Sequence, residues 1–166
     1  GSTSLRLLEY CGAVAVVASL RWLPLALAWP LATCYAGLLD KAIPRLRRIA
    51  YRNLSFAMPS LDARAVTDGV FRSIARILLV FSRFPSITRE NVDEWIRYDG
   101  LEHFEEAKRR GKGVLFATAH LGNWELSAFA HALVTQAMNV IVRPLDNDRI
   151  DGIVETRRAL SGNTII

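Results

Sequence analysis

The chain has 166 residues, of which 51% are hydrophobic, and it carries a formal net charge of +5. This length suffices for one domain with a core, and the apolar content is high for a soluble domain. Cys11 and Cys34 lie inside apolar stretches and no CxxC pair or Cys/His cluster occurs, which argues against a disulfide framework and a structural zinc site.

The positive charge is concentrated in the first 60 residues. They carry seven Lys/Arg and two acidic residues, whereas residues 61–166 carry fourteen of each sign. The basic residues follow directly after an apolar stretch and are not interleaved with aromatic residues. This pattern favours a membrane surface over nucleic acid. We therefore expect contact with membrane lipids and no nucleic-acid partner.

Two apolar stretches lie at the start of the chain. Arg21 separates residues 10–20 from residues 22–39, and Pro24 and Pro30 interrupt the second stretch. Since a membrane-spanning helix needs about 20 apolar residues, neither stretch is a clean span. We expect residues 1–40 to be a hydrophobic membrane anchor, either a broken span or a helical pair dipping into one leaflet. A buried helical hairpin of a soluble protein is the alternative.

Two helices are expected next, in residues 43–60 and 61–83. Pro44 lies near the start of the first helix, and Ser60 is the predicted N-cap of the second. The first helix has an apolar stripe and an opposing basic side, which we expect to meet lipid phosphates; a solvated charged face is the alternative. The stripe consists of Leu46, Ile49, Ala50 and Leu54, and the basic side of Arg45, Arg48 and Arg52.

The pattern changes after Pro85. A short helix near residues 87–94 and a possible strand at 94–100 lead into alternating helices and apolar runs, which predict a βαβαβ unit with a mostly parallel sheet and an α/β fold. The expected strands are residues 113–119, 138–144 and 163–166, and the expected helices are 100–113, 123–134 and 147–160. Because the sequence stops within the third strand, we expect residues 41–166 to be the N-terminal part of a larger, truncated α/β domain.

The stretch ATAHLGNWEL, residues 117–126, joins the first predicted strand to a helix. On one continuous helix His120 and Glu125 would diverge by about 140°, but a turn at Gly122 lets the two side chains converge. Asn123 is well placed to cap the helix. A carboxylate on one imidazole nitrogen fixes the tautomer while the other nitrogen takes a proton. The pair thus indicates general-base catalysis on a hydroxyl. Two ligands are too few for a metal site, so we expect none.

By itself this H-x4-E spacing is a weak signal. The other two histidines are weaker still as catalytic residues. His103 lies on a predicted acidic surface helix, and His131 is expected to be packed or exposed on the helix that follows the motif.

Three blocks together are more specific. RRIAYRNLSFAMP (47–59), GLEHFEEAKRRGKGVLFATAHLGNWE (100–125) and VIVRPLDND (140–148) resemble, in the same order, the bacterial late acyltransferases of lipid A biosynthesis. These lauroyl and myristoyl transferases belong to the wider lysophospholipid and glycerol-phosphate acyltransferase group. The resemblance covers nearly the whole chain from about residue 40.

The resemblance implies that the family's HX4D/E motif falls on His120 and Glu125. His120 would deprotonate a hydroxyl of a glycolipid such as a lipid A precursor, which attacks an acyl carrier protein or coenzyme A thioester. No cofactor is implied beyond that co-substrate. Arg143 matches the family's strand-end arginine, and we expect it to bind substrate together with Asn123 and Trp124. The implied location is the cytoplasmic face of the bacterial inner membrane.

Two other functions remain open. A non-catalytic lipid-binding module would keep the fold without turnover, and an acyl-thioester hydrolase would use the same base on water.

Overall fold

The computed structural model describes residues 3–166 of the chain. Its N-terminal region is a pair of helices, α1 (Thr3–Trp22) and α2 (Leu25–Ala42), which are separated at Leu23 and Pro24. Proline at this boundary is tolerated because the first N–H groups of a helix have no intrahelical partner. The second proline, Pro30, lies inside α2 without ending it. The predicted anchor therefore has the form of two helices.

The next two helices match the predicted ones closely. Helix α3 spans Pro44–Ala57 and begins at its proline, and α4 spans Ala63–Arg83. The predicted cap of α4 was wrong, because Asp62 and not Ser60 holds that position. Asp62 Oδ1 accepts hydrogen bonds from the backbone N–H groups of Arg64 (2.9 Å) and Ala65 (3.2 Å). A carboxylate directly before the first helical residue satisfies these two donors, which a serine two residues upstream does not.

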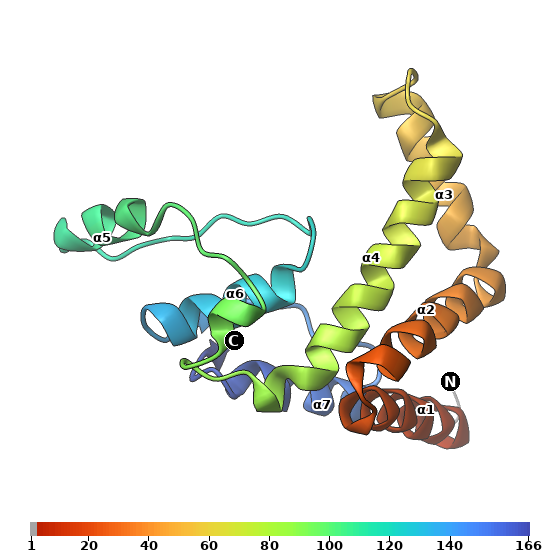
Figure 1. The fold of residues 1–166 in the computed structure, drawn as a ribbon, viewed down its shortest axis with the longest axis horizontal. Helices are drawn as coiled ribbons and strands as arrows, with labels where there is room; N and C mark the ends of the chain where they lie inside the picture. The colour runs from red at the N-terminus through yellow and green to blue at the C-terminus, as the bar shows by residue number, and fades with distance from the viewer. Residues whose placement is uncertain (1–2) are drawn as a thin grey trace.

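The first core lies among α1, α2 and α4, which run close together in Figure 1. Small residues on α2, one turn apart, let this helix approach α4 closely. The buried members of the core are Leu20, Ala28, Ala32, Ala36, Ala75 and Leu79.

Arg47 ties three of these helices together. Its guanidinium bonds to Asp40 at the end of α2 (2.6 Å) and to Asp68 on α4 (2.8 Å), and also to Tyr51 on α3. The pKa of Arg47 is raised above its ordinary value, and the hydrogen bond to Asp40 is the largest cause. One of the seven basic residues in the first 60 positions is therefore structural.

The second half of the chain packs around another core. Two short 3-10 helices, η1 (Phe84–Ser86) and η2 (Val92–Glu94), replace the predicted helix at 87–94. They lead to α5 (Leu101–Arg109), which projects away from the rest of the molecule in Figure 1, and then to α6 (Trp124–Val134). The core residues here are Phe84, Ile87, Val92, Leu126, Phe129 and Ala130.

The sheet is smaller than predicted. Strands β1 (Asn139–Val140) and β2 (Thr164–Ile165) pair in parallel and are joined by α7 (Asp148–Ala159), which confirms one βαβ unit. Residues 113–119 and 94–100, by contrast, form no strand. An apolar run becomes a parallel strand only when neighbouring strands bind its backbone and both faces are covered, but Leu115 is 98% exposed. The three-stranded βαβαβ sheet is thus absent from residues 3–166, which are mostly helical.

Candidate functional site

The segment before α6 is an open turn with a capped helix after it. Gly122 has φ +62°, in the left-handed region that favours glycine. The next residue, Asn123, accepts a hydrogen bond on Oδ1 from the backbone N–H of Leu126 (3.1 Å), so the predicted cap is confirmed. Its side-chain amide nitrogen is buried and has no partner among residues 3–166. The cap fixes the direction in which α6 leaves the turn.

His120 lies in this turn and is exposed. Its ring packs against Trp124, the first residue of α6, with 4.7 Å between ring centroids and 51° between the planes. No hydrogen bond joins the imidazole to Glu125 within the described chain. The predicted contact between base and carboxylate stays a prediction, while the packing on Trp124 holds the ring beside the helix start.

Glu125 has a different partner. Its carboxylate accepts two hydrogen bonds from the guanidinium of Arg158 on α7, at 2.9 Å from Nε and 2.6 Å from Nη2. The two side chains are only 14% and 21% exposed. The hydrogen bond that Arg158 donates to Glu125 is the largest influence on the pKa of Arg158 and raises it. An ionised carboxylate offers about four acceptor positions, so this fork leaves room for an imidazole N–H.

Helix α7 is held against α6 by the loop that follows it. Asn163 accepts a hydrogen bond from the backbone N–H of Met138 (3.0 Å) and donates one to the carbonyl of Ala128 on α6 (3.1 Å). Ser161 donates to the carbonyl of Arg158 (3.0 Å). These bonds fix the end of α7 where it supplies Arg158 to the site.

Arg143 follows β1 and is far more exposed. Its side chain is 89% exposed and forms an ion pair with Asp146 at 3.8 Å. No hydrogen bond or ion pair connects it to His120, Glu125 or Trp124 in the described part of the chain. Its proposed contact with substrate therefore remains a prediction.

A cavity of about 240 Å³ lies beside the helix start. Its walls come from the segment before His120 and from one side of α6. They include Trp124, so the cavity adjoins the residue against which the imidazole of His120 packs. Most of the wall is apolar. The lining residues are Tyr98, Phe116, Ala117, Thr118, Trp124, Ser127, Ala128, His131 and Met138.

His131 is buried and lines this cavity. Thr135 donates its hydroxyl proton to the carbonyl of His131 (2.7 Å), so its oxygen accepts from Nε2–H (2.9 Å). Nδ1 then accepts from the hydroxyl of Tyr98 (2.6 Å). Burial lowers the pKa of His131, in agreement with a neutral ring whose two nitrogens are both satisfied. Of the two positions expected for His131, packed or exposed, the structure shows the packed one, and His103 is exposed on α5 as expected.

An aromatic cluster shapes the cavity. The ring of Phe116 lies edge-on to His131 at 4.4 Å and against Phe104 of α5 at 5.8 Å. These contacts place the segment before His120 alongside α6. Among residues 3–166, no group of three His, Cys, Asp or Glu side chains is arranged to hold a metal ion.

Two features of the site were not predicted from the sequence. Arg158 lies 33 positions from Glu125 on another helix, and Tyr98 lies in a stretch that was expected to be a strand. The parallel βαβ pattern was the only signal for Arg158, because it places consecutive helices side by side.

Comparisons with known proteins indicate a family for this chain. Residues 1–166 match the family described as "Bacterial lipid A biosynthesis acyltransferase". The "Lipid A biosynthesis acyltransferase" of Haemophilus influenzae is 25% identical over 122 residues, which are 70% of this chain and 38% of that relative. The chain thus spans well under half the length of this curated relative. No solved structure matches this chain.

Proposed function

Because this chain belongs to the bacterial lipid A biosynthesis acyltransferase family, we propose that it moves a fatty acyl chain from an acyl thioester to a hydroxyl of a lipid A precursor or a related glycolipid. The donor is acyl carrier protein or coenzyme A, both of which present the same thioester. The proposal rests on the H-x4-E motif, which places His120 in the turn and Glu125 in the first turn of α6.

His120 acts as the general base. Its imidazole takes the proton of the acceptor hydroxyl, and the oxygen attacks the carbonyl carbon of the thioester. The tetrahedral intermediate collapses with cleavage of the C–S bond, and the imidazolium returns the proton to the leaving thiolate. The products are an ester and a free thiol. The exposed position of His120 leaves its ring open to an incoming hydroxyl.

Glu125 orients the base, and Arg158 positions Glu125. The bidentate fork fixes the plane of the carboxylate, and its remaining acceptor positions receive the N–H of His120 once substrate closes the turn. Catalytic hydrogen bonds of this kind often tighten only in the complex with substrate.

The cavity beside Trp124 receives the acyl chain. Its volume of about 240 Å³ and its mostly apolar wall suit a hydrocarbon, and it adjoins the residue against which His120 packs. A thioester whose chain enters here brings its carbonyl toward the turn. Arg143, exposed after β1, binds an anionic group of the donor or acceptor.

The N-terminal helices hold the protein at the cytoplasmic face of the inner membrane. Among the described residues, α1 alone is long and apolar enough to cross a bilayer, and only 6% of its apolar window is buried. Large apolar side chains of both helices are exposed, among them Leu8 (69%) and Trp22 (76%). Phe56, at the end of α3, is 91% exposed, so α3 adds a second apolar contact next to the basic side.

An acyl-transfer assay on the protein in neutral detergent tests the function. The protein is mixed with an acyl thioester of acyl carrier protein or coenzyme A, with and without a lipid A precursor. Thiol release and ester formation are both measured. We expect thiol release to depend on the acceptor and to equal ester formation. Acceptor-independent release of fatty acid would instead indicate a hydrolase. Lipid binding without thiol release would indicate a non-catalytic module, and either result contradicts the proposal.

A further inference from the structure

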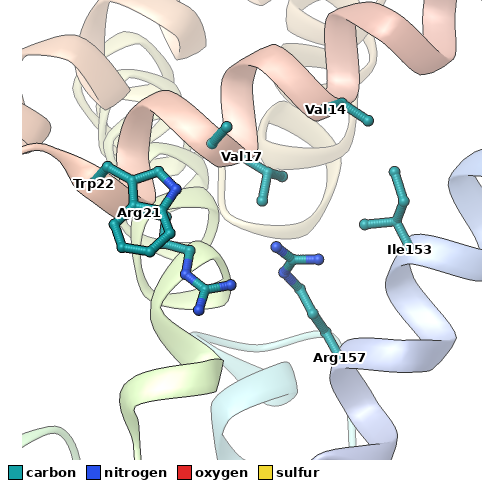
Figure 2. Close-up of a pocket in the computed structure, with 7 residues that line it drawn as sticks. Val14, Val17, Arg21, Trp22, Ile153 and Arg157 are labelled. Carbon is teal, nitrogen blue, oxygen red and sulfur yellow. The ribbon is translucent and has the colours of Figure 1, made fainter.

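A second cavity lies between α1 and α7. It has a volume of about 160 Å³, roughly ten times what one water molecule requires. Figure 2 shows its walls, with Val14 and Val17 on α1 and Ile153 on α7. Arg21, Trp22 and Arg157 line the rest, together with Ala18.

Two guanidinium groups point into this cavity. Arg21 extends from the end of α1 and Arg157 from the end of α7, and both reach into the space between the helices (Figure 2). No acidic residue lines the cavity. Neither side chain has a hydrogen-bond or ion-pair partner within residues 3–166, and Nε of Arg157 is buried as well as unpartnered.

This arrangement is unfavourable for the empty protein. The pKa of Arg157 is lowered. Burial is the larger cause and the charge of Arg21 is the smaller one, because both oppose a positive charge on Arg157. The rings beside the two groups, Trp22 at 4.9 Å from Arg21 and Phe81 at 5.8 Å from Arg157, orient them without neutralising them. An anion between the guanidinium groups would remove the repulsion and satisfy the free donors.

Neighbouring arginines of α7 are divided between two sites. Adjacent positions on a helix point in different directions, so Arg158 reaches Glu125 while Arg157 reaches the space beneath α1. The second cavity therefore does not share its side chains with the proposed catalytic site.

We propose that this cavity binds a phosphate group between Arg21 and Arg157, with the apolar chain of a phospholipid against Val14, Val17 and Ile153. Arginine forks match phosphate geometry, and the apolar walls suit a ligand with a hydrocarbon part. The lipid is the favoured source because the cavity lies at the end of the exposed apolar helix α1. There Trp22 is 76% exposed beside Arg21, and Trp and Arg are typical of the headgroup level of a bilayer.

Binding to the full protein in a neutral detergent tests this site. The probes are a short-chain phosphatidic acid, the phosphatidylcholine with the same chains, and inorganic phosphate, each titrated by calorimetry and by the shift of the thermal midpoint. The variants are Arg21→Met, Arg157→Met and both together, since methionine keeps an apolar stem. Arg64→Met with Arg109→Met is the charge-matched control, because both side chains are exposed and lie on other helices.

We expect phosphatidic acid to bind and to raise the thermal midpoint of the wild type and of the control. Each single variant binds about tenfold more weakly, as expected for loss of a charge-assisted hydrogen bond, and the double variant shows no rise. Without anion, the single variants melt no lower than the wild type, because one of two repelling charges is gone.

Four results would overturn the proposal. Wild-type affinity in the double variant would show that the two arginines form no site. A lower midpoint of both single variants without anion would show that they are structural. Equal affinity for inorganic phosphate and phosphatidic acid would assign the cavity to free phosphate, and equal affinity for phosphatidylcholine would show no selection for the anionic headgroup.

Discussion

The carboxylate of Glu125 and the guanidinium of Arg158 form a bidentate pair, at 2.9 and 2.6 Å, between the first turn of α6 and the last turn of α7. The pair connects the H-x4-E segment to the βαβ unit. It makes the orientation of Glu125 depend on a residue 33 positions away, and this has a direct consequence for stability and for catalysis.

Replacing Arg158 is expected to reduce both. Arg158→Ala leaves a partly buried carboxylate without its partner, which we expect to cost about 2 kcal/mol of unfolding free energy, between the values for exposed and buried pairs. Arg158→Lys keeps the charge but loses the fork, so it should restore most of the stability and less of the acyl-transfer rate. Denaturant unfolding and the transfer assay measure the two effects.

A double-mutant cycle with Glu125→Ala separates the pair from other contacts of Arg158. We expect a coupling energy of about 1–2 kcal/mol. Additive effects of the two substitutions would mean that the pair contributes nothing of its own. Arg149→Ala, at an exposed position on the same helix, is the matched control.

Acid is expected to destabilise the protein through His131. Burial lowers the pKa of His131 in the folded state below its ordinary value of 6.5, so the unfolded chain takes up a proton first as the pH falls. The contribution of His131 to the unfolding free energy is fully present above pH 6.5. Below it, stability declines by at most about 1.4 kcal/mol per pH unit until the folded-state pKa is reached.

His131→Gln removes the titrating ring and keeps an amide for Tyr98 and Thr135. The unfolding free energy of this variant should therefore fall less between neutral pH and pH 5 than that of the wild type. His103→Gln, on the exposed side of α5, should retain the wild-type dependence. Equal acid sensitivity of His131→Gln and the wild type would refute the assignment to His131.

Membrane association is expected to depend on the exposed apolar side chains of α1. Leu8→Asp places a charge on that surface and should weaken partition into phospholipid vesicles by about a hundredfold, since an aspartate in the bilayer costs about 3 kcal/mol. Leu115→Asp is the matched control because Leu115 is 98% exposed outside the anchor. Vesicle sedimentation measures both, and equal partition of the two variants would exclude α1 as the anchor.

Local signals predicted the helices well. Pro44, the helical spacing of α4 and Asn123 as a cap placed α3, α4 and α6 to within a few residues, because each signal acts over one turn of chain. The prediction of a strand at residues 113–119 was wrong, since the described chain has none there. Its apolar run predicts burial, but burial and backbone pairing come from partner strands that a local pattern does not contain.

The site was predicted in part for the same reason. The turn at Gly122 and the position of Glu125 in the first turn of α6 follow from neighbouring residues. The fork from Arg158 and the facing of Arg21 and Arg157 depend on how α7 lies against α1 and near the start of α6, which only the folded chain defines. The roles of His120, Asn123, Trp124 and Arg143 in substrate binding and catalysis stay predictions.

The rate of acyl transfer in His120→Ala tests the central claim most directly. With the acyl thioester and a lipid A precursor both saturating, the variant should transfer the acyl chain about 10²- to 10⁴-fold more slowly than the wild type, the usual contribution of a general base. Its thermal midpoint should remain near that of the wild type, since the imidazole is exposed and has no hydrogen-bond partner among residues 3–166. Transfer at the wild-type rate by the folded variant would contradict a catalytic role for His120.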